Sequence, residues 1–123
     1  MLRIVGVQRS EACDSEFVLL QNQGGLRAQL RGHLVLSEAA LEGAELGQSA
    51  YLFRDDALVP PGMYVMLHSG AGSNRWTKTK DGALVYYVFM NRAEPFWSGV
   101  SGPLHVLNTQ HTFAERRETV RLN

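Results

Sequence analysis

The sequence has a single cysteine, Cys13, and its apolar stretches are all short. One cysteine excludes an intramolecular disulfide and a zinc site built from several cysteines. No stretch approaches the roughly 18 apolar residues that a membrane-spanning helix needs. The amino-terminal segment, residues 1–16, has too short an apolar core for a secretory signal. We therefore expect no membrane partner and, for a complete chain, a cytoplasmic location.

The chain also lacks net charge, because 12 Lys and Arg residues balance 12 Asp and Glu residues. Its composition therefore provides no general attraction to nucleic acids or anionic membranes. Any nucleic-acid site has to be a local patch of basic residues.

Motifs of nucleophilic catalysis and phosphate binding are missing as well. The segment SGVSG at residues 98–102 does not place its serines as a Gly-x-Ser-x-Gly elbow requires. Cys13 lies in the segment EACDSE, where nearby negative charge raises the pKa of a thiol and makes it less reactive. The glycine-rich segment 69–74 lacks the Gly-Lys-Ser of a Walker loop, so we interpret it as an interstrand turn. The sequence predicts no catalytic residue and no cofactor.

The residues that are present fit one globular domain spanning 1–123, with 45% hydrophobic and 20% charged residues. Short segments rich in Val, Leu, Tyr and Phe alternate with Gly, Pro, Asn, Asp and Ser, which is typical of an all-β protein. The spacing favours an antiparallel β-sandwich of about eight or nine strands. The predicted strands are residues 2–8, 16–22, 33–37, 49–53, 63–68, 75–80, 83–90 and 103–108, with 112–121 as the candidate ninth.

Two turns between these strands have a clear mechanism. Pro60-Pro61-Gly62 combines a fixed proline φ with a residue free to take positive φ, which predicts a type II turn. Asp81-Gly82 between two strand patterns predicts a tight hairpin. Residues 37–46 have helix-forming alanines and a candidate cap in Ser37, but Gly43 interrupts them, so we expect a loop with at most one helical turn.

The strand at residues 16–22 is apolar on both faces. Phe17 and Leu19 lie on one face, Val18 and Leu20 on the other, and we assign the first pair to the core, although a one-residue error inverts such an assignment. The acid at its head, Glu16, is expected to order an adjacent turn through backbone amides. The full predicted core is Ile4, Phe17, Leu19, Leu34, Leu36, Leu52, Tyr64, Met66, Val85, Val88, Leu104 and Val106.

The order of four segments resembles the lamin-tail domain, as found in nuclear lamins and bacterial proteins. EFVLLQNQGG at residues 16–25 is similar to the family's first strand, and LRGHLVLS at 30–37 is similar to its next. Residues 51–72, with Pro-Pro-Gly before an aliphatic strand, and the aromatic segment 96–108 are similar to the later parts. The resemblance implies an immunoglobulin-like β-sandwich that acts as a binding or scaffolding module, without shared catalytic residues.

Three aromatic residues are the first candidates for a site that binds a protein partner or a second copy of the chain. Tyr86 and Tyr87 are adjacent in a strand, so one of them has to face away from the core. Phe96 and Trp97 lie in a loop, where exposed rings can bind a peptide, a sugar face or a second copy of the domain. We therefore predict that a protein partner binds through a sheet edge or this aromatic loop, with Tyr87, Phe96 and Trp97 as protein-binding residues. The alternative for Trp97 is that it plugs the end of the sandwich.

The segment RWTKTK supports the alternative function of nucleic-acid binding. A strand would place Trp76, Lys78 and Lys80 on one face with Arg75 beside them, joining a stacking platform to cations. In the competing interpretation the lysines protect an edge strand against aggregation while Trp76 covers the core.

A metal-dependent enzyme is the third possibility, because imidazole is a common metal ligand. The chain has four histidines, His33, His68, His105 and His111, but their spacing contains no short ligand pair. In the alternative, each histidine binds backbone or water. We predict no metal site.

Overall fold

The computed structural model describes residues 1–42 and 49–111 of the chain, and in these ranges the fold is all-β. The largest sheet has five strands in the order β1-β2-β7-β9-β8. Their bounds are β1 (Leu2–Gln8), β2 (Phe17–Asn22), β7 (Tyr64–His68), β9 (Leu84–Phe89) and β8 (Arg75–Lys78). The pairing of β7 with β9 is parallel and the other pairings are antiparallel. The expectation of purely antiparallel strands is therefore wrong at this one pair, because β9 returns from the β8 hairpin into the place beside β7.

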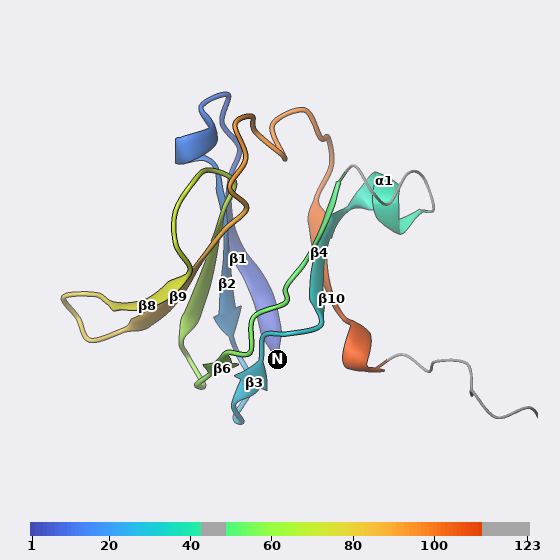
Figure 1. Cartoon of the computed structure of the whole chain (residues 1–123). Coiled ribbons are helices and arrows are strands. Elements are labelled where there is room, and N and C mark those ends of the chain that lie inside the picture. The colour runs from blue at the N-terminus through green and yellow to red at the C-terminus, as the bar shows by residue number, and fades with distance from the viewer. Residues whose placement is uncertain (43–48, 112–123) are drawn as a thin grey trace, which may run out of the picture.

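A second layer faces this sheet, and the core lies between the two layers (Figure 1). Its three-stranded sheet has the order β10-β4-β5, and a two-stranded sheet pairs β3 with β6. The bounds are β3 (Ala28–Gln29), β4 (His33–Ser37), β5 (Ala50–Leu52), β6 (Leu58–Val59) and β10 (Leu104–Asn108). The short helical elements are η1 (Cys13–Ser15), α1 (Glu38–Leu41) and η3 (Thr109–His111).

The predicted strands are all present in the described ranges, with ends that differ by one or two residues. The strand expected to reach Lys80 ends at Lys78, because the tight turn already begins there. The two-residue strands β3 and β6 were not predicted, and the candidate strand 112–121 lies outside the described residues.

Local turn chemistry is confirmed. Gly62 has φ +81°, and the Met63 amide donates to the Pro60 carbonyl at 3.1 Å. Gly82 has φ +86° in the hairpin between β8 and β9. The single helical turn α1 begins after Ser37, whose hydroxyl accepts a hydrogen bond from the Ala40 amide at 3.1 Å.

The core prediction is wrong in the face it assigned to β2 and β7. Val18 and Leu20 are buried in the core in place of Phe17 and Leu19. The same one-residue inversion buries Val65 and Leu67 in place of Tyr64 and Met66, Val35 in place of Leu34, and Phe53 in place of Leu52. Val88 is in the core as predicted, and Ile4, Leu104 and Val106 pack against it. Leu36 and Val85 are also buried, but they lie outside the core cluster.

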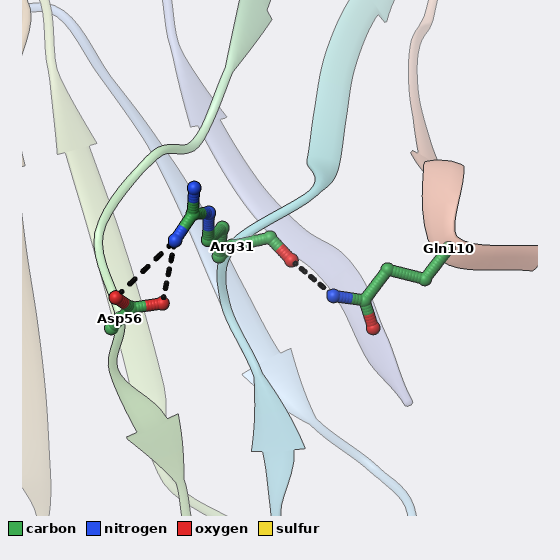
Figure 2. A network of polar contacts seen from close by, with 3 residues as sticks. All are labelled: Arg31, Asp56 and Gln110. Carbon is green, nitrogen blue, oxygen red and sulfur yellow. Dashed lines mark hydrogen bonds and ion pairs between the residues drawn. The ribbon is translucent and has the colours of Figure 1, made fainter.

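One exposed polar network joins loops at the end of the molecule where η3 lies (Figure 2). Both Asp56 carboxylate oxygens lie 3.4 Å from an Arg31 guanidinium nitrogen, and the Gln110 side-chain amide donates to the Arg31 carbonyl at 3.3 Å. The Arg31 and Asp56 side chains are 62% and 67% exposed, so the ion pair is screened by solvent and adds little stability.

In contrast, the carboxylate of Glu16 is fully buried. Its Oε1 accepts hydrogen bonds from the Ser69 hydroxyl at 2.5 Å and from the amides of Phe96 and Trp97 at 2.7 and 2.9 Å. Its Oε2 accepts a longer one from the Ser10 amide at 3.4 Å. Glu16 thus joins the start of β2 to two distant loops.

These contacts also set the charge of the carboxyl group. Burial by itself would raise the pKa of Glu16, but the hydrogen bonds from Ser69, Trp97, Phe96 and Ser10 outweigh it and hold the pKa below its ordinary value of 4.5. Glu16 is therefore a buried carboxylate anion at neutral pH.

We predict that Glu16→Ala lowers the free energy of unfolding by about 2–4 kcal/mol, because it leaves buried amide donors without an acceptor. Urea unfolding at pH 7 measures the change, and Glu11→Ala, at an exposed acid, is the matched control. An alanine variant within about 0.5 kcal/mol of the wild type would contradict the role of Glu16.

The lowered pKa of Glu16 also predicts how stability depends on pH. Its contribution is fully present above the unfolded pKa near 4.5 and is lost as the pH falls through the lower folded pKa. Thermal unfolding between pH 7 and pH 3 should therefore show a steeper loss of stability for the wild type than for Glu16→Gln. Parallel curves for the two proteins would show that the carboxylate charge is not involved.

Candidate interaction surface

The five-stranded sheet carries a second set of apolar side chains on the side away from the core. Strand register places them next to one another across β2, β7 and β9. Apart from the buried Val85 they are half-buried, and we call this surface the outer face. Its members are Phe17, Leu19, Tyr64, Met66, His68, Val85, Tyr87 and Phe89.

An aromatic cluster forms the center of the outer face. The His68 ring stacks on Phe89 with centroids 4.9 Å apart, and its centroid lies 5.5 Å from Tyr87 and 6.1 Å from Phe17. The Arg75 guanidinium lies 5.3 Å from the Tyr87 ring centroid and 5.6 Å from that of Phe89. These distances allow cation–π attraction, so the cluster has an apolar floor and a cationic side.

A hollow of about 490 Å³ lies over this cluster. Its rim includes Asp14 and the first part of the glycine-rich segment 69–74. A Cβ at Gly70 would overlap the Asp14 carboxylate, and a Cβ at Gly72 would lie 2.6 Å from the Phe89 ring. The segment joins β7 to β8, which confirms the turn interpretation, and its glycines allow the backbone to pack closely on Asp14 and Phe89.

The floor of the hollow disfavours a positive charge on His68. Burial lowers the pKa of His68 below its ordinary value of 6.5, and the nearby Arg75 guanidinium lowers it further. At neutral pH the ring is therefore an uncharged aromatic surface.

The three predicted protein-binding aromatic residues do not share one surface. Tyr86 packs against the core while Tyr87 lies on the outer face, as the alternation predicted. Trp97 is 0% exposed and belongs to the core, which confirms the alternative that it plugs the end of the fold. Phe96 is half-buried, contacts Trp97 edge-on and lies under the Arg92 guanidinium at 4.7 Å. Tyr87 alone of the three belongs to the outer face.

The predicted nucleic-acid residues are divided between two faces. Trp76 and Lys78 lie on one side of β8, whereas Arg75 lies on the other side over Tyr87 and Phe89. Lys80 lies in the turn after β8. Trp76 is 39% exposed and packs on Tyr86, which itself packs against the core, so Trp76 lies at the margin of the core and not within it.

The four histidines considered for a metal-dependent enzyme do not gather at one place, and His111 ends η3. His33 is buried in β4 with Nδ1 3.1 Å from the Leu30 carbonyl, His68 is on the outer face, and His105 lies 3.8 Å from Glu38. In residues 1–42 and 49–111 no three side chains of His, Cys, Asp or Glu gather as metal ligands would. The same ranges contain no helix long and apolar enough to cross a membrane.

Other groups with potential chemistry are engaged in structural contacts. The Cys13 thiol donates to the Arg92 carbonyl at 3.2 Å, and burial, with the charges of Asp14 and Glu16, raises its pKa. Burial and the hydrogen bond from its hydroxyl to Asp55 raise the pKa of Tyr86 to about 12.

Comparison with known proteins adds no relative: no family model matches this chain, and no curated protein matches its sequence. The resemblance to the lamin-tail domain stays a prediction. Sequence reasoning found Tyr87 but missed Met66, His68 and Phe89 as members of one surface. The available signal was the apolar character of both faces of β2 and β7.

We predict that the pKa of His68 in the folded protein, measured by NMR titration, lies below 6.5 and rises when Arg75 is replaced by Gln. The substitution removes a positive charge beside the ring. Arg27 lies beside β3 and outside the aromatic cluster, so Arg27→Gln should leave the pKa of His68 unchanged. If Arg75→Gln leaves the pKa of His68 unchanged, the Arg75 guanidinium does not influence the charge of the His68 ring.

Proposed function

We propose that this chain is a non-enzymatic interaction module that binds a protein partner through the outer face of its five-stranded sheet. The observation that carries the proposal is the set of half-buried aromatic and apolar side chains continuous across β2, β7 and β9. Strands that are apolar on both faces are usually covered on both faces. In the described part of the chain, the second layer covers the inner face, and a partner would cover the outer one.

The chemistry of the outer face fits a protein surface. Contiguous apolar patches on soluble proteins commonly mark interaction sites, and aromatic residues, Met and Arg are enriched at the centers of interfaces. Tyr87, Met66 and Phe89 supply the apolar area, and Arg75 supplies one cation at the side. The partner would therefore present an apolar surface with a carboxylate positioned for Arg75.

The proposal of a non-enzymatic function is supported by the contacts of acidic side chains that are engaged in structural hydrogen bonds. Glu16 is held by Ser69 and two backbone amides, and Asp55 by Tyr86 and Asn74. The resemblance to the lamin-tail domain supports the same function and an immunoglobulin-like sandwich type, since members of that family act through contacts with other molecules.

Site-specific photo-cross-linking in the source cells tests the proposed surface. We expect a photoreactive amino acid at Met66 to give a discrete protein adduct, whereas the same residue at Leu58, which is 52% exposed on β6, gives none. No adduct at residue 66, or the same adducts at both positions, would contradict the proposal. An adduct of the purified protein with itself would identify a second copy as the partner.

Affinity for the adduct partner provides the second measurement. Met66→Lys and Tyr87→Lys place a charge on the apolar surface and should weaken binding by about tenfold or more. Because both side chains lie on the outer face and are not in the core, the melting temperature should change little. Unchanged affinity in both variants would exclude the outer face as the contact.

A further inference from the structure

Strand β8 forms one end of the five-stranded sheet and pairs only with β9 among the described residues. In Figure 1 the β8–β9 hairpin extends away from the second layer, so its edge is not covered by the other sheet. An end strand presents backbone groups that can pair with a further strand.

The hydrogen-bond pattern between β8 and β9 determines which backbone groups of β8 are available at this edge. The Thr79 amide donates to the Ala83 carbonyl at 2.9 Å, which makes this opposed pair a hydrogen-bonded one. Since hydrogen-bonded pairs alternate in an antiparallel ladder, Arg75 and Thr77 also bond to β9. The amides and carbonyls of Trp76 and Lys78 therefore point away from β9, toward the open edge.

The basic side chains beside this edge form no ion pair with the acids that the structure describes. Both lysines of the chain, Lys78 and Lys80, are in this hairpin, and Arg75 starts β8. Among residues 1–42 and 49–111 Arg31 forms an ion pair with Asp56, seen in Figure 2, and His105 lies 3.8 Å from the Glu38 carboxylate. The basic side chains of the hairpin can therefore form ion pairs with carboxylates of a partner.

Trp76 adds an apolar contact at the same edge. Its ring packs on Tyr86 at 5.0 Å, yet the residue stays 39% exposed. Tyr86 is itself fixed, because its hydroxyl donates to Asp55, and Asp55 also accepts from Asn74. The partly exposed aromatic side chain therefore has a firm support, and it belongs to the strand with which an added strand would pair.

We propose that the β8 edge binds an extended acidic segment of a protein partner as an added strand. The inference rests on the proposed function. It adds a second contact, next to the outer face, and specifies the kind of partner segment that binds there. Opposite Lys78, Thr77, Trp76 and Arg75 the segment would carry, in order, an acid, any residue, an apolar residue and an acid. Cross-strand pairs of this kind, with opposite charges or apolar contact, stabilise pairing.

Charge selects this occupant over a second copy of β8. Two copies joined at this edge would bring Arg75 and Lys78 of both chains to one seam with no acid between them, and like charges at a seam are destabilising. Nucleic acid is favoured less, because Arg75 faces away from Trp76 and Lys78 and because a nucleotide does not satisfy alternating amides and carbonyls.

A labelled peptide of sequence STETIETS, titrated against the intact protein by fluorescence anisotropy up to about 1 mM, tests the proposal. We expect saturable binding, at least about tenfold weaker binding of the matched peptide STKTIKTS, and loss of binding when alternate backbone amides of STETIETS are N-methylated. Lys78→Glu should weaken binding about tenfold or more, whereas Arg27→Glu, with the same charge change at an exposed site near β3, should not.

Hydrogen exchange measured by NMR gives the structural readout. On peptide binding, the amides of Trp76 and Lys78 should gain protection while those of Arg75 and Thr77, already bonded to β9, change little. No binding of STETIETS, equal binding of the lysine or N-methylated peptide, or tighter binding of oligo(dT) in competition would overturn the proposal. These outcomes do not depend on adducts at Met66, so the edge and the outer face can fail separately.

Discussion

The buried carboxylate of Glu16 is the interaction on which the end of the fold depends. A charge removed from water is costly unless donors surround it, and here a hydroxyl and backbone amides from two loops do so. The amides belong to Phe96 and Trp97, so the same contact holds Trp97, the largest fully buried side chain, in the core. Ser69 is fixed at the same point, and it begins the segment that forms the rim of the hollow on the outer face.

Neither the position of Trp97 nor the outer face could be predicted from the spacing of residues in the sequence, because both depend on contacts between distant segments. Glu16 and Trp97 are 81 residues apart, and their contact is a property of the assembled layers. The parallel pairing of β7 with β9 is equally nonlocal. In contrast, the Gly62 and Gly82 turns follow from the chemistry of adjacent residues, and the sequence predicted both.

The choice of face in β2 and β7 shows where a strand pattern loses its information. Both faces of FVLL and YVML are apolar, so alternation identifies two sets of side chains without saying which is inside. The inner set consists of Val and Leu, whereas the outer set contains one Leu together with Phe, Tyr, Met and His. The outer face is therefore apolar but can still be in contact with water, because its Tyr and His side chains each present a polar atom.

Arg75 connects the outer face to the β8 edge. Its guanidinium covers Tyr87 and Phe89, and its backbone belongs to the strand at the end of the sheet. Arg75 and Lys78 can therefore act against unwanted association and in favour of one class of partner at once. Like charges disfavour a second copy at the edge, while a carboxylate from a partner can replace water around the guanidinium without displacing it from the rings. In the proposed function, positive charge at this edge would provide specificity, and the apolar face beside it would provide the contact area.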